Sequence, residues 1–389
     1  MTHDAKTVLA SARDLAPTIS ARAAEIESNR RLPPDLLAQL TAAGLFRMFV
    51  PKSHGGLDLD YPTSMEIIEA LATADGATGW VVMIGCETPM LLALMPPRRF
   101  DQLYADTPDV IIAGGFAPRG AAEPQSDRSY RVNGRWAFAS GCQHSSWLLG
   151  NCVVTENGKP RPGLIPGTPE VRAMLFKAER ATILDTWHVA GMRGTGSHDI
   201  AVKDIIVPPD DTFDIFLGRP TIPGPGLSEP LLYAAMHIGA VGVGIAERAL
   251  SEMIKLAGTD KQRLYAQSSI AASPLFQYRL GHAATSLRAA RGILRSEADA
   301  VWAIAVAERV ATPADRSRVM GTVTWVAHTA ASVVDACYTA GGGTSPYDAS
   351  PLQRCLRDIH TLTQHAAVAE SWLSGAGASV LGADSGFAL

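Results

Sequence analysis

Two histidines near the end of the chain carry the side chain best suited to acid–base chemistry at neutral pH. His360 and His365 lie in the stretch RDIHTLTQHA (357–366). An imidazole with an unperturbed pKa near 6.5 can hold or release a proton under physiological conditions. The carboxylate that follows them is Glu370, about one helical turn beyond Ala366. The stretch therefore favours a histidine as the acid–base group, with Glu370 as the alternative base.

A second group of candidate residues lies in the segment FASGCQHSSW (138–147). Ser140 ends a β-type run and precedes Gly141, so its hydroxyl and the neighbouring backbone N–H groups could contact a planar heterocycle. His144 and Trp147 follow within the same segment. A lone histidine in such a loop commonly has a structural role. The alternative is that His144 lines the wall of an active site, and we keep it as a candidate for that role.

Glycines in DTWHVAGMRGTGSHD (185–199) predict a loop that passes close to another group. Their positions, Gly191, Gly194 and Gly196, do not follow the GxGxxG pattern, and no strand–turn–helix unit surrounds them. The run GAVGVG (239–244) lies inside a helical stretch, where its glycines favour close helix packing. The chain therefore has no dinucleotide-binding fingerprint.

Composition and charge exclude several classes of function. With 389 residues, the chain is long enough for two or three domains with buried cores. Its net charge is −4 and it has no dense Lys/Arg block, so we expect no nucleic-acid partner. Its five cysteines are scattered without a CxxC pair, which predicts neither a disulfide framework nor a metal site. A reducing cytoplasm is the compartment that fits best.

We also expect no membrane attachment. The N-terminal residues carry mixed charges from Asp4 onward and lack a hydrophobic signal core. The most apolar run, 231–250, contains His237, several glycines and then Glu247-Arg248. It falls short of the roughly 18 to 20 clean apolar residues that a membrane span needs. This run is therefore predicted to be a buried core helix.

The elements that must position these candidates begin with a helical region and a region of short strands. Residues 1–105 are predicted to be an α-helical domain, with one helix starting at the prolines of Leu32-Pro33-Pro34-Asp35. A longer helix is predicted through MEIIEALATADGATGWVVMI (65–84). Residues 106–218 contain β-type runs, among which Asn133-Gly134 predicts a two-residue hairpin turn.

The remainder of the chain, 228–389, is predicted to be helical again. A linker rich in proline and glycine precedes it. Four long helices are predicted, approximately at 230–258, 275–308, 313–340 and 352–380. Four helices of this length imply a four-helix bundle.

The order of helices, strands and a bundle, together with four sequence stretches, resembles the acyl-CoA dehydrogenase fold over nearly the whole chain. The resemblance implies an α+β multidomain protein with an N-terminal helical domain, a middle antiparallel β domain and a C-terminal four-helix bundle. Within it, SGCQHSSW resembles the oxygenase components of two-component flavin-dependent monooxygenases, such as the 4-hydroxyphenylacetate and secosteroid hydroxylases. The four stretches are LPPDLLAQLTAAGLFRMFVPKSHGGLDLD (32–60), GRWAFASGCQHSSWLLG (134–150), DTWHVAGMRGTGSHDIAVKDIIVP (185–208) and PLQRCLRDIHTLTQH (351–365).

The resemblance implies roles for the candidate residues. Phe138 and Ser140 look like the aromatic and hydroxyl residues that contact the flavin ring in this fold. Trp147 is implied as a further flavin contact, and Arg193 as a residue that faces either the flavin phosphate or neighbouring helices. His144 stays a candidate for the catalytic set together with Ser140.

The C-terminal stretch supplies the catalytic expectation. The place of the catalytic glutamate in an acyl-CoA dehydrogenase falls on Ala366, next to His365, which matches the active-site histidine of the monooxygenases. His360 is expected to cap or bridge helices. One departure from the monooxygenase pattern is IGCETPM (84–90), where these hydroxylases often carry a histidine or an asparagine.

The implied activity is the hydroxylation of an aromatic, phenolic small molecule through a flavin hydroperoxide, with reduced FMN or reduced FAD as cofactor and O2 as cosubstrate. Because the chain has no dinucleotide fingerprint, a separate NAD(P)H-dependent flavin reductase is the implied partner. The resemblance further implies a homotetramer. Two alternatives stay open: an acyl-CoA dehydrogenase with tightly bound FAD and Glu370 as its base, and a non-enzymatic protein with a degenerate site. The substrate stays open, as do the choice between FMN and FAD and the atom that is oxygenated, which can be carbon, nitrogen or sulfur.

Overall fold

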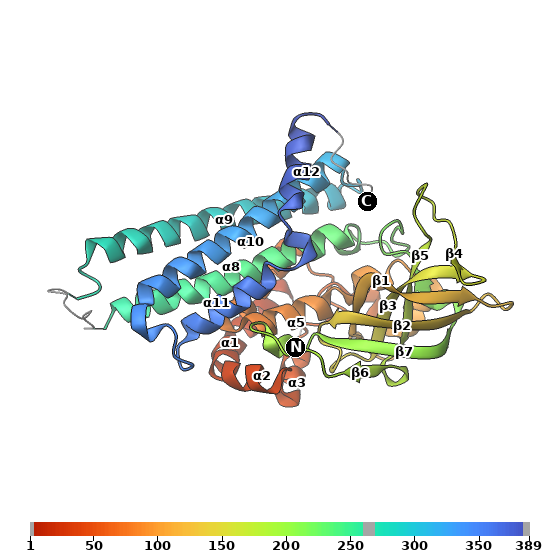
Figure 1. The fold of residues 1–389 in the computed structure, drawn as a ribbon, viewed down its shortest axis with the longest axis horizontal. Helices are drawn as coiled ribbons and strands as arrows, with labels where there is room; N and C mark the ends of the chain where they lie inside the picture. Colours follow the sequence, from red (N-terminus) through yellow and green to blue (C-terminus); the bar gives the residue numbers. More distant parts are fainter. Residues whose placement is uncertain (1–3, 260–268, 384–389) are drawn as a thin grey trace.

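The first part of the chain is helical, and its helices pack beside a sheet and a long helical bundle (Figure 1). The structure is a computed structural model and describes residues 4–259 and 269–383. The helix predicted after the Leu32-Pro33-Pro34-Asp35 stretch is confirmed, because α3 begins at Pro34. The helices are α1 (Ala5–Ala21), α2 (Ala23–Asn29), α3 (Pro34–Ala42), α4 (Tyr61–Ala74), α5 (Gly76–Cys86), α6 (Thr88–Leu92) and α7 (Pro97–Tyr104).

The single helix predicted over 65–84 is wrong, because two helices meet there at Asp75. This residue has an extended backbone (φ −159°, ψ 122°), and its carboxylate accepts a hydrogen bond from the backbone N–H of Thr78 at 2.8 Å. An N-cap of this kind satisfies a free N–H group at the start of a helix and so begins α5 anew. Periodicity alone misses the break because apolar residues continue across it.

The middle region is a mixed sheet, and this corrects the expectation of a purely antiparallel one. The strands lie in the order β6-β7-β2-β1-β3-β5-β8, with β4 paired to β3. The pair β1–β3 is parallel, whereas the other pairs in this order are antiparallel. The bounds are β1 (Ile112–Pro124), β2 (Tyr130–Ala139), β3 (Trp147–Glu156), β4 (Lys159–Pro160), β5 (Val171–Lys177), β6 (Thr182–Leu184), β7 (His198–Val207) and β8 (Thr212–Phe213).

The hairpin turn predicted at Asn133-Gly134 is also wrong, since both residues lie inside β2. The Asn133 side chain instead bonds across to Asp204 on β7, donating to its carboxylate and accepting from its backbone N–H. A Cβ on Gly134 would lie 2.4 Å from the ring of Trp136, so glycine is needed for close packing rather than for a turn. The chain reverses between β1 and β2 at 125–129, where the Gln125 N–H donates to the Ser129 carbonyl.

The C-terminal region is a bundle whose fourth predicted helix is interrupted. The helix predicted over 352–380 ends at Leu362, and a short 3₁₀ turn, η7 (Ala366–Val368), precedes the next helix. The break occurs at His365, which has an extended backbone (φ −72°, ψ 137°) and whose Nδ1 accepts from the Ala367 N–H at 3.2 Å. The helices are α8 (Pro230–Ala257), α9 (Pro274–Val306), α10 (Pro313–Gly341), α11 (Pro351–Leu362) and α12 (Ser371–Val380).

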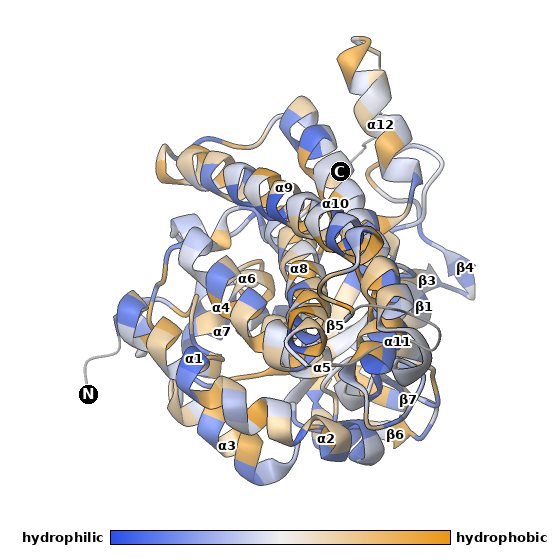
Figure 2. Ribbon diagram, turned by 90° about the vertical axis from the view of Figure 1, so that its left-hand side faces the viewer, coloured by the Kyte–Doolittle hydropathy of each residue, from blue (hydrophilic) through white to orange (hydrophobic). Residues whose placement is uncertain are grey.

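Helix α8 lies at the centre of the helical part, enclosed by α4, α5, α9, α10 and α11 (Figure 2). In the described part of the chain it is the one helix long and apolar enough to cross a membrane, but 78% of its apolar window is buried inside the protein. A Cβ on Gly244 would lie 2.6 Å from the Glu69 carbonyl oxygen on α4. The prediction of a core helix with glycines for close packing is therefore confirmed.

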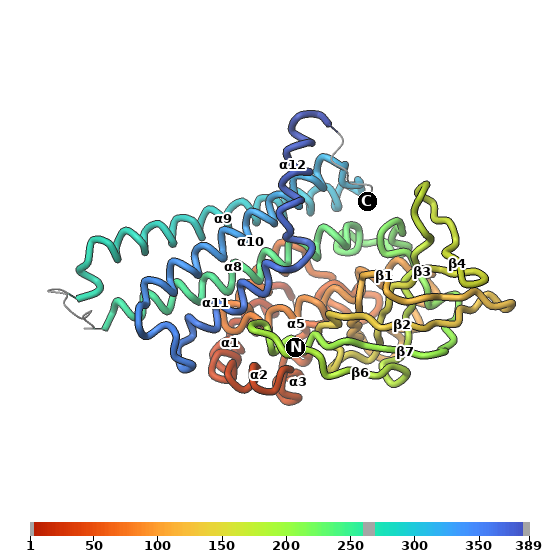
Figure 3. Tube along the Cα trace, in the orientation of Figure 1, coloured from red at the N-terminus to blue at the C-terminus, as the bar shows by residue number. Residues whose placement is uncertain are grey.

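Helix α5 joins the two halves of the molecule, because it lies between the bundle and the sheet (Figure 3). It contacts α4, α8 and α11 on the helical side, and β1 on the sheet side. It is apolar along its length, and nearly all of its residues are buried. A side chain on α5 can therefore meet groups from both regions.

Candidate active site

Trp80 on α5 brings the two main candidates together. Its indole Nε1–H donates to the Ser140 hydroxyl at 3.1 Å. Its ring also meets the imidazole of His365 edge-on, with ring centroids 5.5 Å apart. Ser140 and His365, far apart in the sequence, are thus bridged by one tryptophan. The sequence gives no sign of this role, because Trp80 reads as one more apolar residue of a buried helix.

The imidazole of His365 has one nitrogen engaged and one available. Nδ1 accepts from the Ala367 N–H, so in the neutral ring the proton resides on Nε2. Within the described residues, Nε2 has no hydrogen-bond partner. The residue as a whole is exposed to solvent. The protein atoms packed around its ring nevertheless desolvate the charged form, which lowers the pKa of His365 below its usual value. At neutral pH, His365 therefore presents an uncharged ring with a free N–H donor.

Behind Ser140 runs a chain of buried hydroxyl groups. The Ser140 Oγ lies 2.7 Å from the Ser197 Oγ, which lies 2.6 Å from the Thr195 Oγ1. Thr195 in turn donates to the Met192 carbonyl oxygen at 2.8 Å. All three hydroxyl residues are at least nine-tenths buried. Sequence reasoning marked the glycines of this loop but missed Thr195 and Ser197, whose roles appear only when the loop meets β2.

Phe138 presents an aromatic surface two residues before Ser140. Its side chain is 71% exposed, and its φ of 65° lies in the left-handed region that non-glycine residues rarely adopt. Trp187 packs against its ring edge-on at 6.2 Å and is itself held by a bond from Nε1 to the Met192 carbonyl oxygen. Backbone strain of this kind costs on the order of 1 kcal/mol and tends to occur at functional sites. The arrangement leaves an open aromatic face beside a buried hydroxyl.

His144 and Trp147 make contacts of another kind. His144 Nε2 accepts from the Leu32 N–H at 3.3 Å, and burial lowers its pKa to about 4, so the ring is neutral and ties this turn to the N-terminal helices. Trp147 begins β3, and the guanidinium of Arg99 lies 5.2 Å from its ring centroid. Arg99 is itself paired with Asp211. No contact described in the structure joins either residue to Trp80.

The Arg-Asp pair before the histidines clamps the glycine-rich loop to α11. The guanidinium of Arg357 donates to the Ala190 carbonyl oxygen at 2.6 Å, and the Asp358 carboxylate accepts from the Met192 N–H at 2.5 Å. A Cβ on Gly191 would lie 2.0 Å from the Arg357 carbonyl oxygen, so this glycine is needed for the close approach. Burial raises the pKa of Asp358 to about 7, and Asp75 adds to the rise.

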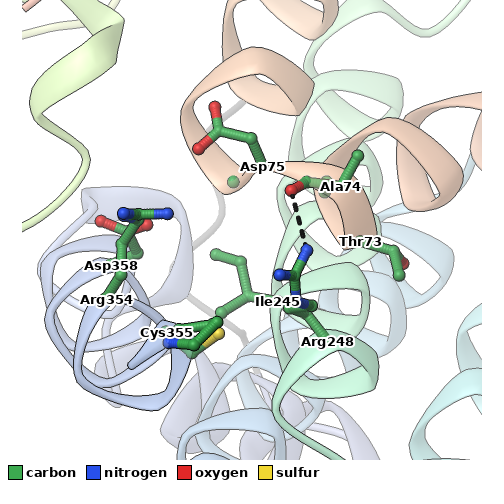
Figure 4. Close-up of a pocket in the computed structure, with 11 residues that line it drawn as sticks. Thr73, Ala74, Asp75, Ile245, Arg248, Arg354, Cys355 and Asp358 are labelled. Carbon is green, nitrogen blue, oxygen red and sulfur yellow. Dashed lines mark hydrogen bonds between the residues drawn. The ribbon is translucent and has the colours of Figure 1, made fainter. Parts of the chain in front are cut away.

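Asp358 and Asp75 also line a small hollow at the start of α5 (Figure 4). Arg248 points into it from α8 and donates to the Ala74 carbonyl oxygen at 3.4 Å. Arg193 lines a neighbouring hollow with Asp75 and Asp358, and its Nε is buried without a partner among the described residues. None of Trp80, Ser140 and His365 lines either hollow. The hollows belong to the joint between helices, beside the candidate site.

The departure at IGCETPM is explained by a buried polar cluster. Glu87 Oε1 lies 2.8 Å from Nδ1 of His237, whose Nε2 lies 2.9 Å from the Ser64 hydroxyl. Burial raises the pKa of Glu87, whereas the bond to His237 opposes the rise. Its neighbours Cys86 and Thr88 bond to backbone groups. This segment therefore holds α4, α5 and α8 together through one buried acid–histidine pair.

Two further residues of the C-terminal stretch lie at the surface. His360 Nε2 lies 2.8 Å from the Asp335 carboxylate on α10, which confirms the prediction that it bridges helices. Glu370 is exposed at the start of α12, and its side chain makes no capping bond there. The structure therefore places a histidine, rather than this carboxylate, against Trp80.

Comparisons with known proteins agree with this fold. Residues 2–95 match the family model for the acyl-CoA dehydrogenase N-terminal domain, and residues 236–370 match that for the C-terminal domain. The chain is 32% identical to the indole-3-acetate monooxygenase of Pseudomonas putida over 93% of this chain and 90% of that protein. It is 30% identical to the oxygenase subunit HsaA of a flavin-dependent monooxygenase from Rhodococcus jostii, over 91% and 92%.

A solved structure extends the match to three dimensions. XiaF from a Streptomyces species, in complex with FADH2 and glycerol, superimposes with a TM-score of 0.91 at 26% identity, covering 98% of this chain and 96% of that one. The matches favour the monooxygenase reading over the acyl-CoA dehydrogenase alternative and over a non-enzymatic protein. With the acyl-CoA dehydrogenase fold and relatives of this kind, the chain belongs to the family of flavin-dependent monooxygenases, as an oxygenase component.

Proposed function

We propose that this oxygenase component hydroxylates a small aromatic compound of the phenolic class next to His365 and Trp80. The observation that carries the proposal is the convergence of Trp80, Ser140 and His365 from three separate segments. A free imidazole donor, an aromatic ring and a buried hydroxyl are the groups that an aromatic substrate beside a flavin requires. Indole-3-acetate is a further candidate substrate, because a relative of this chain is named for it.

Reduced FMN or reduced FAD fits beside Phe138 and Ser140. The exposed ring of Phe138 offers a flat apolar surface, and Ser140 offers a polar atom at its edge. When bound, the reduced flavin supplies the electrons with which one atom of O2 enters the product and the other leaves as water. Trp147 and Arg193 stay predicted cofactor contacts: the described contact of Trp147 is with Arg99, and Arg193 lines a hollow with Asp75 and Asp358.

In this proposal, His365 orients the substrate as a hydrogen-bond donor. Its Nδ1 is occupied by the Ala367 N–H, so a substrate oxygen would meet Nε2–H. Acting as a base through Nε2 would require the proton to move to Nδ1 and the bond to Ala367 to break. The contact with the Trp80 ring holds the imidazole in place and excludes water from one side of it.

We further propose a separate NAD(P)H-dependent flavin reductase as the source of electrons, and a homotetramer as the working assembly. The tetramer is supported by large apolar side chains left exposed on the bundle, including Tyr278 on α9, Trp325 on α10 and Val380 on α12. A cytoplasmic location is supported by the five cysteines, which are all buried and free. A monomer in light scattering at micromolar concentration would contradict the assembly alone.

The proposed reaction is tested by isotope labelling. Purified protein is mixed with a flavin reductase, NADH, FMN or FAD, and either 4-hydroxyphenylacetate or indole-3-acetate under ¹⁸O2. The expected result is one ¹⁸O atom in the aromatic product by mass spectrometry. If neither compound is oxygenated while an acyl-CoA reduces flavin bound to the protein, the dehydrogenase alternative is correct instead.

A further inference from the structure

The chain of hydroxyl groups behind Ser140 has one consistent direction of hydrogen bonding. At its far end, the Met192 carbonyl oxygen can only accept, so Thr195 must donate its hydroxyl proton to it. Ser197 must then donate to Thr195, and Ser140 must donate to Ser197. At the near end, the Trp80 indole N–H can only donate, and it donates to Ser140. All four bonds form together only in this order.

The consequence is that Ser140 has no proton left for a ligand. Its single hydroxyl hydrogen points toward Ser197. Toward any group on the open side, the Ser140 oxygen can therefore act only as an acceptor. The polar partner that this oxygen selects is a hydrogen-bond donor.

We propose that this chain makes the site selective for reduced flavin over oxidised flavin. The N5 atom of a reduced flavin carries a hydrogen and donates, whereas N5 of an oxidised flavin has only a lone pair and accepts. Ser197 and Thr195 are then positioning residues, which hold the Ser140 hydroxyl in its accepting orientation. The inference rests on the proposed placement of the flavin edge at Ser140, and it adds the reason why one oxidation state is preferred.

The size of the selectivity follows from the hydrogen bond within the protein that is lost when Ser140 donates to oxidised flavin. For Ser140 to donate to N5, Ser197 must turn to donate to Ser140, and Thr195 must turn to donate to Ser197. The Thr195 hydroxyl bond to the Met192 carbonyl oxygen is then lost, although the bond from Trp187 to that oxygen remains. Losing one buried neutral hydrogen bond corresponds to roughly a 2- to 10-fold change in relative affinity.

Two substitutions relieve this constraint without touching Ser140. Ser197→Ala removes the acceptor of the Ser140 proton, which frees that proton to point toward N5. Thr195→Val keeps the side-chain shape but removes the acceptor of the Ser197 proton, so Ser197 can turn to donate to Ser140. In both variants, the ratio of the dissociation constants of oxidised to reduced flavin should fall roughly 2- to 10-fold.

The experiment measures binding rather than turnover. The full-length wild type and each variant are titrated anaerobically with oxidised FMN and with dithionite-reduced FMN, and both titrations are repeated with FAD. Because the ratio compares two ligands on one preparation, a partly unfolded variant changes both constants alike and leaves the ratio intact. Ser145→Ala is the matched control, since this buried serine directly follows the turn after Ser140 and, among the described residues, its hydroxyl bonds to the Gly141 carbonyl oxygen alone.

The outcomes separate the inference from the proposed function. A fall of the ratio in both Ser197→Ala and Thr195→Val, with no change in Ser145→Ala, supports the inference. An unchanged or increased ratio in the two variants overturns it, while tight binding by the wild type still supports a flavin at this site. If the wild type binds neither oxidation state, the proposed placement of the flavin fails, and the inference fails with it.

Discussion

Replacing Asp358 by asparagine tests whether the buried carboxyl that clamps Met192 is held in its neutral form. The pKa of this carboxyl is raised from 3.8 to about 7 in the folded protein, mainly by burial. A raised acid pKa means that the folded state binds the proton more tightly than the unfolded state does. The stability gained from this proton is complete below about pH 4 and is lost as pH rises through 7.

The magnitude follows from linkage between protonation and folding. With pKa values of 3.8 unfolded and about 7 folded, the wild type should lose about 2 kcal/mol of unfolding free energy from this group between pH 5 and pH 7. Asparagine resembles the protonated carboxyl in shape, and its carbonyl oxygen can still accept from the Met192 N–H. The variant should therefore become more stable relative to the wild type by about 2 kcal/mol over the same interval.

The assay is urea unfolding followed by circular dichroism at constant ionic strength, from pH 5 to pH 8. Asp358→Asn is compared with the wild type at each pH, so that groups common to both proteins cancel. Asp299→Asn, on the exposed side of α9, is the control for exchanging a surface carboxylate for an amide. A pH-independent difference between Asp358→Asn and the wild type would refute the reasoning and would mean that the carboxyl is charged in the fold.

Other changes probe the active site and the core. His365→Ala should lower product formation roughly 10²- to 10⁴-fold while flavin oxidation continues and releases hydrogen peroxide, whereas the surface variant His360→Ala should keep product and flavin oxidation coupled. Normal hydroxylation by His365→Ala together with an inactive Glu370→Ala would favour the carboxylate as the base. Trp80→Phe should keep the aromatic contact to His365 but weaken reduced-flavin binding, measured by anaerobic titration, because the indole N–H no longer fixes the position of the Ser140 hydroxyl. Glu87→Ala should cost about 3 to 5 kcal/mol in urea unfolding, because it leaves Nδ1 of the buried His237 without its carboxylate partner; a loss below 1 kcal/mol would contradict the buried pair.

The candidate groups could be found from sequence where their chemistry is local. Ser140 ends a β-type run before a glycine, and His365 lies where a carboxylate is missing, so both are visible in short stretches of sequence. The surroundings of these groups were not visible. Trp80 meets Ser140 across 60 residues of chain, and Thr195 and Ser197 matter only because their loop packs against the end of β2. Such contacts are set by tertiary packing, which a single sequence does not display.

The errors in the predicted elements have the same cause. The Asn133-Gly134 pair satisfies the local rule for a hairpin, but Gly134 is required by the Trp136 ring that fills the sheet. The stretch after Leu362 keeps a helical composition, yet α11 ends there, and the bond from the Ala367 N–H to the His365 ring starts a separate 3₁₀ turn. In both places a contact with a specific side chain overrides the local preference of the backbone.

Helix α11 is linked to both sides of the active site. The Asp358 carboxylate, within the helix, accepts a hydrogen bond from the Met192 N–H. The Met192 carbonyl oxygen accepts the hydrogen bond from Thr195 that ends the hydroxyl chain. His365, three residues past the end of the helix at Leu362, carries the substrate-side donor against Trp80. A displacement of α11 would therefore move the imidazole and the hydroxyl chain together. A change inside the sheet, for example at Trp136, would instead shift Ser140 relative to the His365 imidazole and to the rest of the hydroxyl chain. We therefore expect core changes in the sheet to uncouple flavin binding from substrate oxygenation more readily than changes in α11 do.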